Sequence, residues 1–113
     1  MHEYSLIQSL VERVEAEARA RNATAIHRVD VRIGELAGVD IELFKTAYLT
    51  FRDRTVCEHA DLQVDVIPVV WACDTCGGRI APGQPLQCPS CERPARLVGG
   101  DDIVLARIEM EVA

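Results

Sequence analysis

The sequence predicts an α+β fold in which two helices cover one face of a small three-stranded mixed sheet, with a four-cysteine lobe inserted before the last strand. Two segments have the apolar spacing of amphipathic helices, and three others alternate between apolar and polar residues as half-buried strands do. The cysteines fall in two closely spaced pairs. We therefore expect a main domain formed by residues 1–69 and 99–113, and a separate domain formed by residues 70–98.

The first helix is predicted near the amino terminus, where apolar residues recur with the spacing that places them on one face. These residues are Leu6, Ile7, Leu10, Val11, Val14 and Ala18. Ser5 with Gln8 fits a capping box, although the helix can equally begin nearer His2. Asn22 is expected to end it, because asparagine tolerates the left-handed conformation found after helices.

A second helix is predicted from Asp40, which stands in the position of an N-cap, to about Arg52. Its apolar face is expected to carry Leu43, Phe44, Ala47, Tyr48 and Phe51.

Three strands are predicted from strict alternation over residues 27–33, 62–66 and 104–112. The residues expected on their apolar faces are Val29, Val31 and Ile33, then Leu62, Val64 and Val66, then Val104, Ala106, Ile108, Met110 and Val112. His27 is expected on or beside the apolar face of the first strand, as a histidine satisfied within the core.

The strongest local signal is a doubled CxxC motif. Cys73 and Cys76 are followed, after eleven intervening residues, by Cys88 and Cys91. This is the spacing of a four-thiolate zinc ribbon, and Gly77 and Gly78 after the first pair suit the positive φ values that such a turn needs. Four thiolates complete the tetrahedral shell of zinc, so the motif predicts a structural zinc ion and not a catalytic one.

Two disulfides, or a redox CxxC, are the alternatives for these cysteines. No secretory apolar segment precedes the first predicted helix, so an oxidising compartment has no support. A redox CxxC usually occurs singly beside a βαβ pattern. The fifth cysteine, Cys57, is interpreted as a small apolar or partly exposed thiol.

The net charge of −6 argues against a nucleic-acid-binding ribbon, because phosphate contacts need clustered lysine and arginine. Within residues 70–98 the cations are Arg79, Arg93 and Arg96, against Asp74 and Glu92. No apolar run approaches the length of a membrane span. We therefore expect a soluble, cytoplasmic protein that binds neither nucleic acid nor membrane.

The opening residues, Met1-His2-Glu3, have the chemistry of a second metal site. A free terminal amine, the amide nitrogen of residue 2 and the His2 imidazole can close adjacent chelate rings on one ion. Nitrogen-rich, tetragonal sites suit Cu(II) and Ni(II) better than Zn(II) or Mg(II). The alternative is that His2 is an exposed residue on a frayed terminus.

Met1-His2-Glu3, the segment Ile33-Gly34-Glu35-Leu36-Ala37-Gly38-Val39-Asp40 and the two CxxC pairs, in this order, resemble the HypA/HybF family of nickel metallochaperones for hydrogenase maturation. The resemblance covers essentially the whole chain. It implies a mixed α/β nickel-binding domain that carries a four-cysteine zinc domain. It also implies a protein that is not an enzyme and that delivers Ni(II) to the [NiFe]-hydrogenase large subunit precursor with a nickel-binding GTPase. Some members also serve urease maturation, so urease maturation proteins are a further candidate partner.

The resemblance further implies that His2 centres the nickel site, and that Glu3 and Asp40 match acidic positions placed beside the metal. Zinc is then a structural ion and nickel a transferred cargo. Two other hypotheses stay open: a zinc-ribbon adaptor that acts only through protein contact, and a zinc hydrolase. The hydrolase is disfavoured because a four-cysteine site has no open position, and because His27 and His59 lack HExxH spacing.

Overall fold

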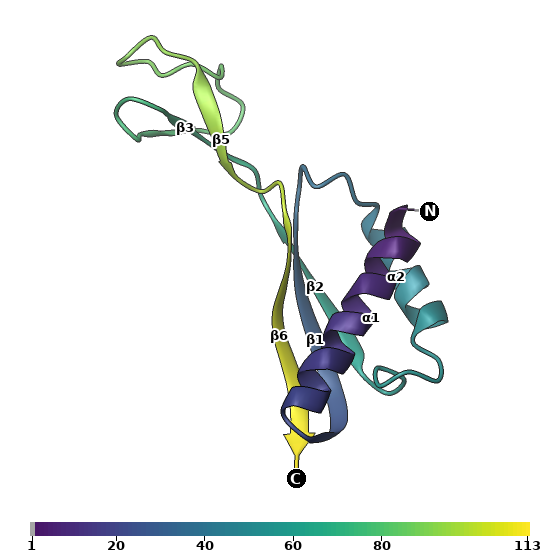
Figure 1. The fold of residues 1–113 in the computed structure, drawn as a ribbon. Coiled ribbons are helices and arrows are strands. Elements are labelled where there is room, and N and C mark those ends of the chain that lie inside the picture. Colours follow the sequence, from purple (N-terminus) through teal and green to yellow (C-terminus); the bar gives the residue numbers. More distant parts are fainter. Residues whose placement is uncertain (1) are drawn as a thin grey trace.

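The computed structural model describes residues 2–113. Along the chain the elements are α1 (His2–Ala20), β1 (Ala23–Gly34), α2 (Ile41–Phe51), β2 (Asp61–Ile67), β3 (Val70–Cys73), β4 (Arg79–Ile80), β5 (Ala95–Gly99) and β6 (Ile103–Val112). The molecule is elongated, with extents of 55 × 29 × 16 Å. Figure 1 shows the helices beside a long sheet, and a lobe containing β3 and β5 that extends away from them.

The long sheet has the strand order β2-β1-β6 and is mixed. β1 pairs with β2 in parallel, with Val31 opposite Val64, and with β6 in antiparallel orientation, with Val29 opposite Ile108. A parallel pair needs a crossover connection, which the segment containing α2 supplies. The predicted α+β fold, with two helices and a mixed three-stranded sheet, is confirmed.

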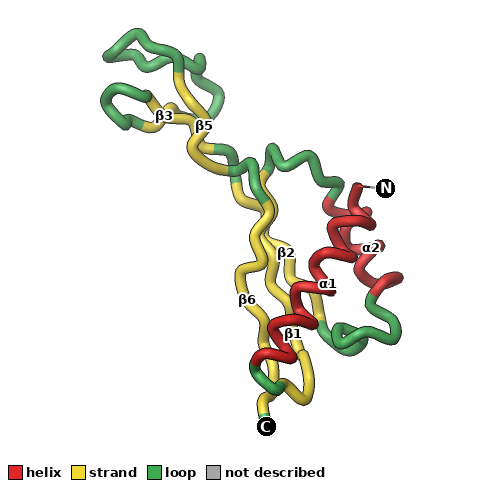
Figure 2. The backbone as a smooth tube through the Cα atoms, in the orientation of Figure 1, coloured by secondary structure: helices red, strands yellow, loops and turns green. Residues whose placement is uncertain are grey.

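The hydrophobic core lies between this sheet and the two helices, which cover the same face of the sheet (Figures 1 and 2). Its buried residues are Ile7, Val11, Val14, Ala18, Ile26, Val29, Val31, Ile33, Phe44, Ala47, Tyr48, Cys57 and Ala60. Every one of them precedes residue 70, so this core is built without the cysteine segment.

The helix ends differ slightly from those predicted. α1 begins at His2, so Ser5 lies inside the helix and does not cap it. Asn22 follows it with a φ of 53°, as expected for a residue that ends a helix. Asp40 caps α2 with its side chain, as predicted. The buried face of α2 is narrower than expected, since Leu43 in its first turn is 42% exposed.

The prediction for His27 is wrong. The β1–β6 register shifts between Ile26 and Arg28, and this irregularity turns the intervening residue away from the core. The His27 side chain is about half exposed, and its Nε2 lies 2.8 Å from Oε1 of Glu111.

The predicted alternation of β6 also fails at one point. Asp30 pairs with Arg107 and Val31 pairs with Leu105, which leaves Ala106 as the extra residue of a bulge. A one-residue slip exchanges the two faces of a strand. Leu105 therefore packs on the core together with Ile108 and Met110, whereas Val104 is exposed.

The smaller sheet has the order β4-β3-β5 and is antiparallel, with Trp71 paired with both Ile80 and Leu97. Residues 68–69 and 100–102 connect it to the long sheet. The division of the chain at residues 70–98 stays a prediction, which this separate sheet supports. In residues 2–113 the structure contains no helix with the length and hydropathy needed to cross a membrane.

Candidate metal centres

The first CxxC pair lies at the end of β3 and in the turn that follows it. The N–H of Gly77 donates to the carbonyl oxygen of Cys73 at 3.0 Å, and the N–H of Cys73 donates to that of Gly78 at 2.8 Å. Gly77 has a φ of 72°, the left-handed conformation predicted for this turn. The same prediction for Gly78 is wrong, because Gly78 does not have a positive φ. The N–H of Thr75 also donates to Sγ of Cys73 at 3.3 Å. The backbone thus holds the first sulfur inside a tight loop.

The second CxxC pair repeats this hydrogen-bond pattern. The N–H of Glu92 donates to the carbonyl oxygen of Cys88 at 2.8 Å, and the N–H of Cys88 donates to that of Arg93 at 2.9 Å. Glu92 has a φ of 55° and occupies the position that Gly77 has in the first turn. The sequence offered no sign of this, because Glu92 is not a residue type that favours the left-handed region.

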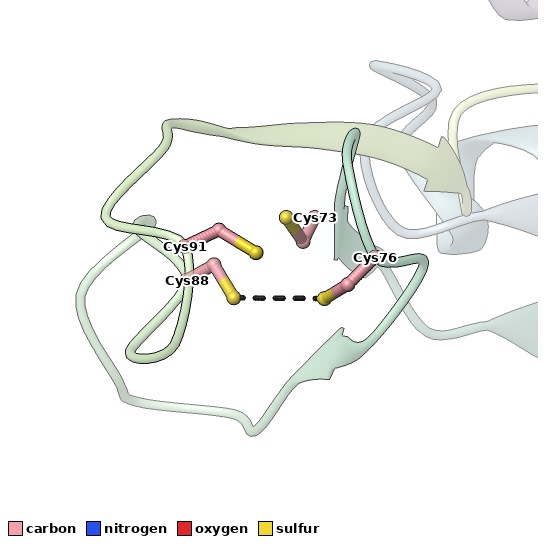
Figure 3. A group of neighbouring side chains, drawn as sticks. All are labelled: Cys73, Cys76, Cys88 and Cys91. Atoms are coloured by element: carbon pink, nitrogen blue, oxygen red, sulfur yellow. Dashed lines mark hydrogen bonds between the residues drawn. The ribbon is translucent and has the colours of Figure 1, made fainter.

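The four sulfurs come together from these two turns. Figure 3 shows the side chains of Cys73, Cys76, Cys88 and Cys91 directed toward one another. All four Sγ atoms lie within 4.8 Å of one another, and Sγ of Cys76 is 3.8 Å from Sγ of Cys88. A tetrahedral zinc ion with Zn–S bonds of about 2.3 Å requires sulfurs about 3.8 Å apart. The donor set therefore suits a structural zinc ion.

The thiols of this cluster have unequal pKa values without a metal ion. Hydrogen bonds from the N–H groups of Cys76 and Thr75 lower the pKa of Cys73 to about 6. The neighbouring sulfurs, Cys73 first, raise the pKa of Cys91 to about 12. Four thiolates at this spacing repel one another, so a divalent cation is needed to hold all four deprotonated.

Within the main domain, the structure brings Glu3 and Asp40 together. Oε2 of Glu3 accepts a hydrogen bond from the N–H of Asp40 at 3.1 Å. Oδ1 of Asp40 accepts one from the N–H of Leu43 at 3.0 Å, which caps α2. The Asp40 N–H holds the pKa of the Glu3 carboxyl below its usual range. The first turn of α1 is thereby attached to the start of α2.

His2 is the first residue of α1 and its side chain is exposed. Its position next to Glu3 in the sequence places it at the same end of the helix pair. Met1 lies outside the described residues, so the amine predicted as a nickel ligand lies outside them too. An exposed imidazole at the end of a helix can bind an exchangeable ion, because solvent and an acceptor protein both have access to it.

Comparison with known proteins identifies the family of this chain. A family model described as hydrogenase/urease nickel incorporation, metallochaperone, HypA matches residues 1–110. The chain belongs to the HypA family. The resemblance seen in the sequence is therefore confirmed.

HypA proteins of known sequence match over nearly their full length. The hydrogenase maturation factor HypA of Shewanella baltica strain OS185 is 35% identical over 113 residues, which are 98% of this chain and 97% of the relative. The HypA of Aquifex aeolicus is 35% identical over 114 residues, which are 99% of each chain.

Solved HypA structures share the fold. The solution structure of the Ni metallochaperone HypA from Helicobacter pylori matches with a TM-score of 0.74 and 31% identity over 98% of each chain. A second HypA solution structure matches with a TM-score of 0.82 and 32% identity, covering 100% of this chain and 98% of the other. The HypA family incorporates nickel, and nickel is therefore its cargo, whereas the four-cysteine site suits a structural zinc ion.

The remaining candidate residues form no further metal-binding group within residues 2–113. Among residues 2–113, the four cysteines are the one group of three or more His, Cys, Asp or Glu residues close enough to share an ion. His59 is 89% exposed and pairs with Glu58, and His27 pairs with Glu111. Cys57 is fully buried, and burial raises the pKa of its thiol. The geometry therefore gives no support to a zinc hydrolase site.

Proposed function

We propose that this chain binds Ni(II) through His2 at its amino terminus and delivers it for maturation of a [NiFe]-hydrogenase. The acceptor is the large subunit precursor, and a nickel-binding GTPase acts with the chain. Urease maturation proteins are a second candidate destination, since the matching family description covers hydrogenase and urease. The chain carries an ion and does not convert a substrate.

The observation that carries this proposal is the hydrogen bond from the Asp40 N–H to Glu3. It attaches the first turn of α1 to the capped end of α2. His2, the first residue of α1, is therefore held near the start of α2. The Glu3 and Asp40 carboxylates add negative charge at the end of the helix pair where His2 lies. Negative charge favours a divalent cation there.

We further propose that Cys73, Cys76, Cys88 and Cys91 hold a zinc ion that stabilises the smaller lobe. Such an ion contributes folding free energy to the lobe, in which few of the residues that the structure describes are buried. Because the four thiolates fill its coordination shell, it does not exchange with the cargo. We also propose a cytoplasmic location, because cysteines that bind zinc as thiolates persist in a reducing compartment.

The test is a nickel titration of the untagged protein and of His2→Ala, with zinc measured in parallel. His59→Ala is the matched control, because His59 is an exposed histidine outside the proposed site. We expect His2→Ala to abolish nickel binding, while zinc content and the unfolding transition stay unchanged. His59→Ala should bind nickel like the parent protein.

Two results decide against the proposal. Full nickel binding by His2→Ala would move the site elsewhere, and zinc without any nickel binding in the parent protein would support the zinc-ribbon adaptor. A version with residues added ahead of Met1 separates the ligands further. This version should bind nickel more weakly if the terminal amine is a ligand. Unchanged binding would show that the amine is not a ligand, while His2 could still be one.

A further inference from the structure

The two sheets are joined where three backbone segments cross. Residues 34–36, which are the last residue of β1 and the two that follow it, contact both connectors of the smaller lobe. The N–H of Glu35 donates to the carbonyl oxygen of Ile67 at 2.8 Å, and the N–H of Leu36 donates to that of Gly100 at 2.7 Å. One short segment therefore holds the chain both where it enters the lobe and where it leaves.

Two glycines let the three backbones approach this closely. A Cβ on Gly34 would lie 2.3 Å from the backbone carbon of Gly100. A Cβ on Gly100 would lie 2.5 Å from Cα of Val69, and Gly100 also has a φ of 88°. No other residue type fits either position without moving the backbone. The crossing is thus built from main chain packed on main chain.

Glu35 adds a side-chain contact to this crossing. Its Oε1 accepts a hydrogen bond from the N–H of Val69 at 3.0 Å, while its own N–H binds Ile67. Pro68, between them, has no N–H to contribute. Glu35 therefore holds the entering connector on both sides of the proline.

Within residues 2–113, the strands of the lobe make few contacts with the helices and strands of the main domain. A hollow of about 380 Å³ lies beside the crossing, lined by Glu35, Pro68, Trp71 and the turn around Pro82. The strands β3, β4 and β5 contact mainly one another. Parts of a chain that share only a small interface are expected to move relative to each other. The orientation of the lobe then depends on the crossing itself.

We propose that Glu35 is a positioning residue, which holds the cysteine lobe in one orientation relative to the helices by accepting a hydrogen bond from Val69. The contact needs an acceptor oxygen and not a charge. This orientation sets where the lobe stands relative to the terminus that bears His2. Its importance for nickel delivery rests on the proposed function, but the positioning itself does not.

The experiment compares the zinc-loaded full chain with Glu35→Ala and Glu35→Gln. Alanine removes the acceptor and leaves every backbone contact of the crossing, so the variant should fold. Glutamine keeps an acceptor oxygen at the same reach and removes the charge. Residual dipolar couplings and ¹⁵N relaxation of weakly aligned protein report the orientation and motion of the lobe relative to the long sheet.

We expect the parent protein and Glu35→Gln to show one common alignment for both sheets. In Glu35→Ala the couplings of β3 and β5 should fall relative to those of β1 and β6, and the two parts should tumble with different correlation times. Separate alignment in the parent protein, or common alignment in Glu35→Ala, would overturn the proposal. So would a loss of common alignment in Glu35→Gln, because it would assign the effect to charge.

A nickel titration of the same three proteins distinguishes a failure of this inference from a failure of the proposed function. Glu35→Ala should bind nickel as the parent protein does, since the side chain contacts a connector and not the amino terminus. A parent protein that binds no nickel would defeat the proposed function and leave the positioning result standing. A large loss of nickel binding in Glu35→Ala alone would show that Glu35 acts on the nickel site itself, and would overturn its assignment to the lobe.

Discussion

At the scale of single residues, Asp40 has two roles that can be separated by experiment. Its Oδ1 caps α2, and the family resemblance places its carboxylate beside nickel. Asparagine caps a helix about as well as aspartate, whereas losing the cap costs about 0.5–2 kcal/mol. We therefore predict that Asp40→Asn leaves the thermal unfolding of the metal-free protein unchanged and weakens nickel binding several-fold.

Asp40→Ala serves as the control for the cap, because it should lower the free energy of unfolding as well as nickel binding. The measurements are thermal unfolding and nickel titration of the three proteins at one pH and salt concentration. Equal nickel affinity in Asp40→Asn and the parent protein would limit Asp40 to its role as a cap. The carboxylate contribution would then come from Glu3 alone.

The hydrogen bond between Glu3 and Asp40 predicts how folding stability depends on pH in the acid range. The Asp40 N–H lowers the pKa of the folded-state Glu3 carboxyl below its ordinary value of 4.5. The charged form is favoured by folding, so its stabilisation is present above pH 4.5 and is lost as the pH falls through the lowered value. Glu3→Gln cannot show this loss. The stability advantage of the parent protein over Glu3→Gln should therefore shrink below pH 4.5.

Urea unfolding of the parent protein and Glu3→Gln between neutral and acid pH measures this difference in stability. Both proteins release zinc at low pH, so this effect cancels in the comparison. Glu12→Gln, an exposed substitution on α1, is the control for a carboxylate away from Asp40. A constant difference between the parent protein and Glu3→Gln across the range would mean that the hydrogen bond to Asp40 does not favour the charged carboxyl in solution.

At the scale of elements, the positive φ at one position of each cysteine turn predicts that two substitutions change the stability of the lobe in opposite directions. A left-handed L-residue costs roughly 1–2 kcal/mol, and the extra freedom of glycine in the unfolded chain offsets about 0.5–1 kcal/mol of that. Glu92→Gly should therefore stabilise the lobe by about 0.5–1 kcal/mol, and Gly77→Ala should destabilise it by a similar amount. A Cβ on Gly77 meets nothing within 4 Å, so backbone strain is the whole effect.

Zinc competition against a chelator measures both substitutions, since folding of the lobe and zinc binding are coupled. The apparent zinc dissociation constant should fall about two- to five-fold in Glu92→Gly and rise by a similar factor in Gly77→Ala. Changes of the same sign in both variants would contradict the shared geometry of the two turns.

The periodicity of the sequence predicted the helices and the central strand well. Ile7, Val11 and Val14 are buried at helical spacing, and Val29 and Val31 at strand spacing, because one face of each element must leave water. The bulges at His27 and Ala106 were not predictable in this way. A bulge depends on how two strands, distant in the sequence, share their hydrogen bonds.

At the scale of the whole molecule, the location of the core predicts what zinc removal does. Every buried residue of the cluster between the helices and the long sheet precedes the cysteine segment. We expect a chelator, in the presence of reductant, to unfold the smaller lobe and leave the main domain folded. Amide spectra should keep the dispersed signals of β1 and β6 and lose those of β3 and β5. Loss of all cooperative unfolding would show that the two parts depend on each other.

The sequence by itself determined the elements of the main domain, the family and the four-cysteine cluster, because each depends on local spacing or on residue types in a fixed order. It also named Glu3 and Asp40 as neighbours of a metal, but only through resemblance. The tertiary structure decided that Glu3 binds the Asp40 backbone, that Glu92 takes the place of a glycine, and that Glu35 contacts Val69. The turn at Glu92 is local, but glutamate is not a residue type that signals a left-handed conformation. The contacts of Glu3 and Glu35 join segments more than thirty residues apart, so they are set only when those segments pack and local sequence patterns cannot encode them.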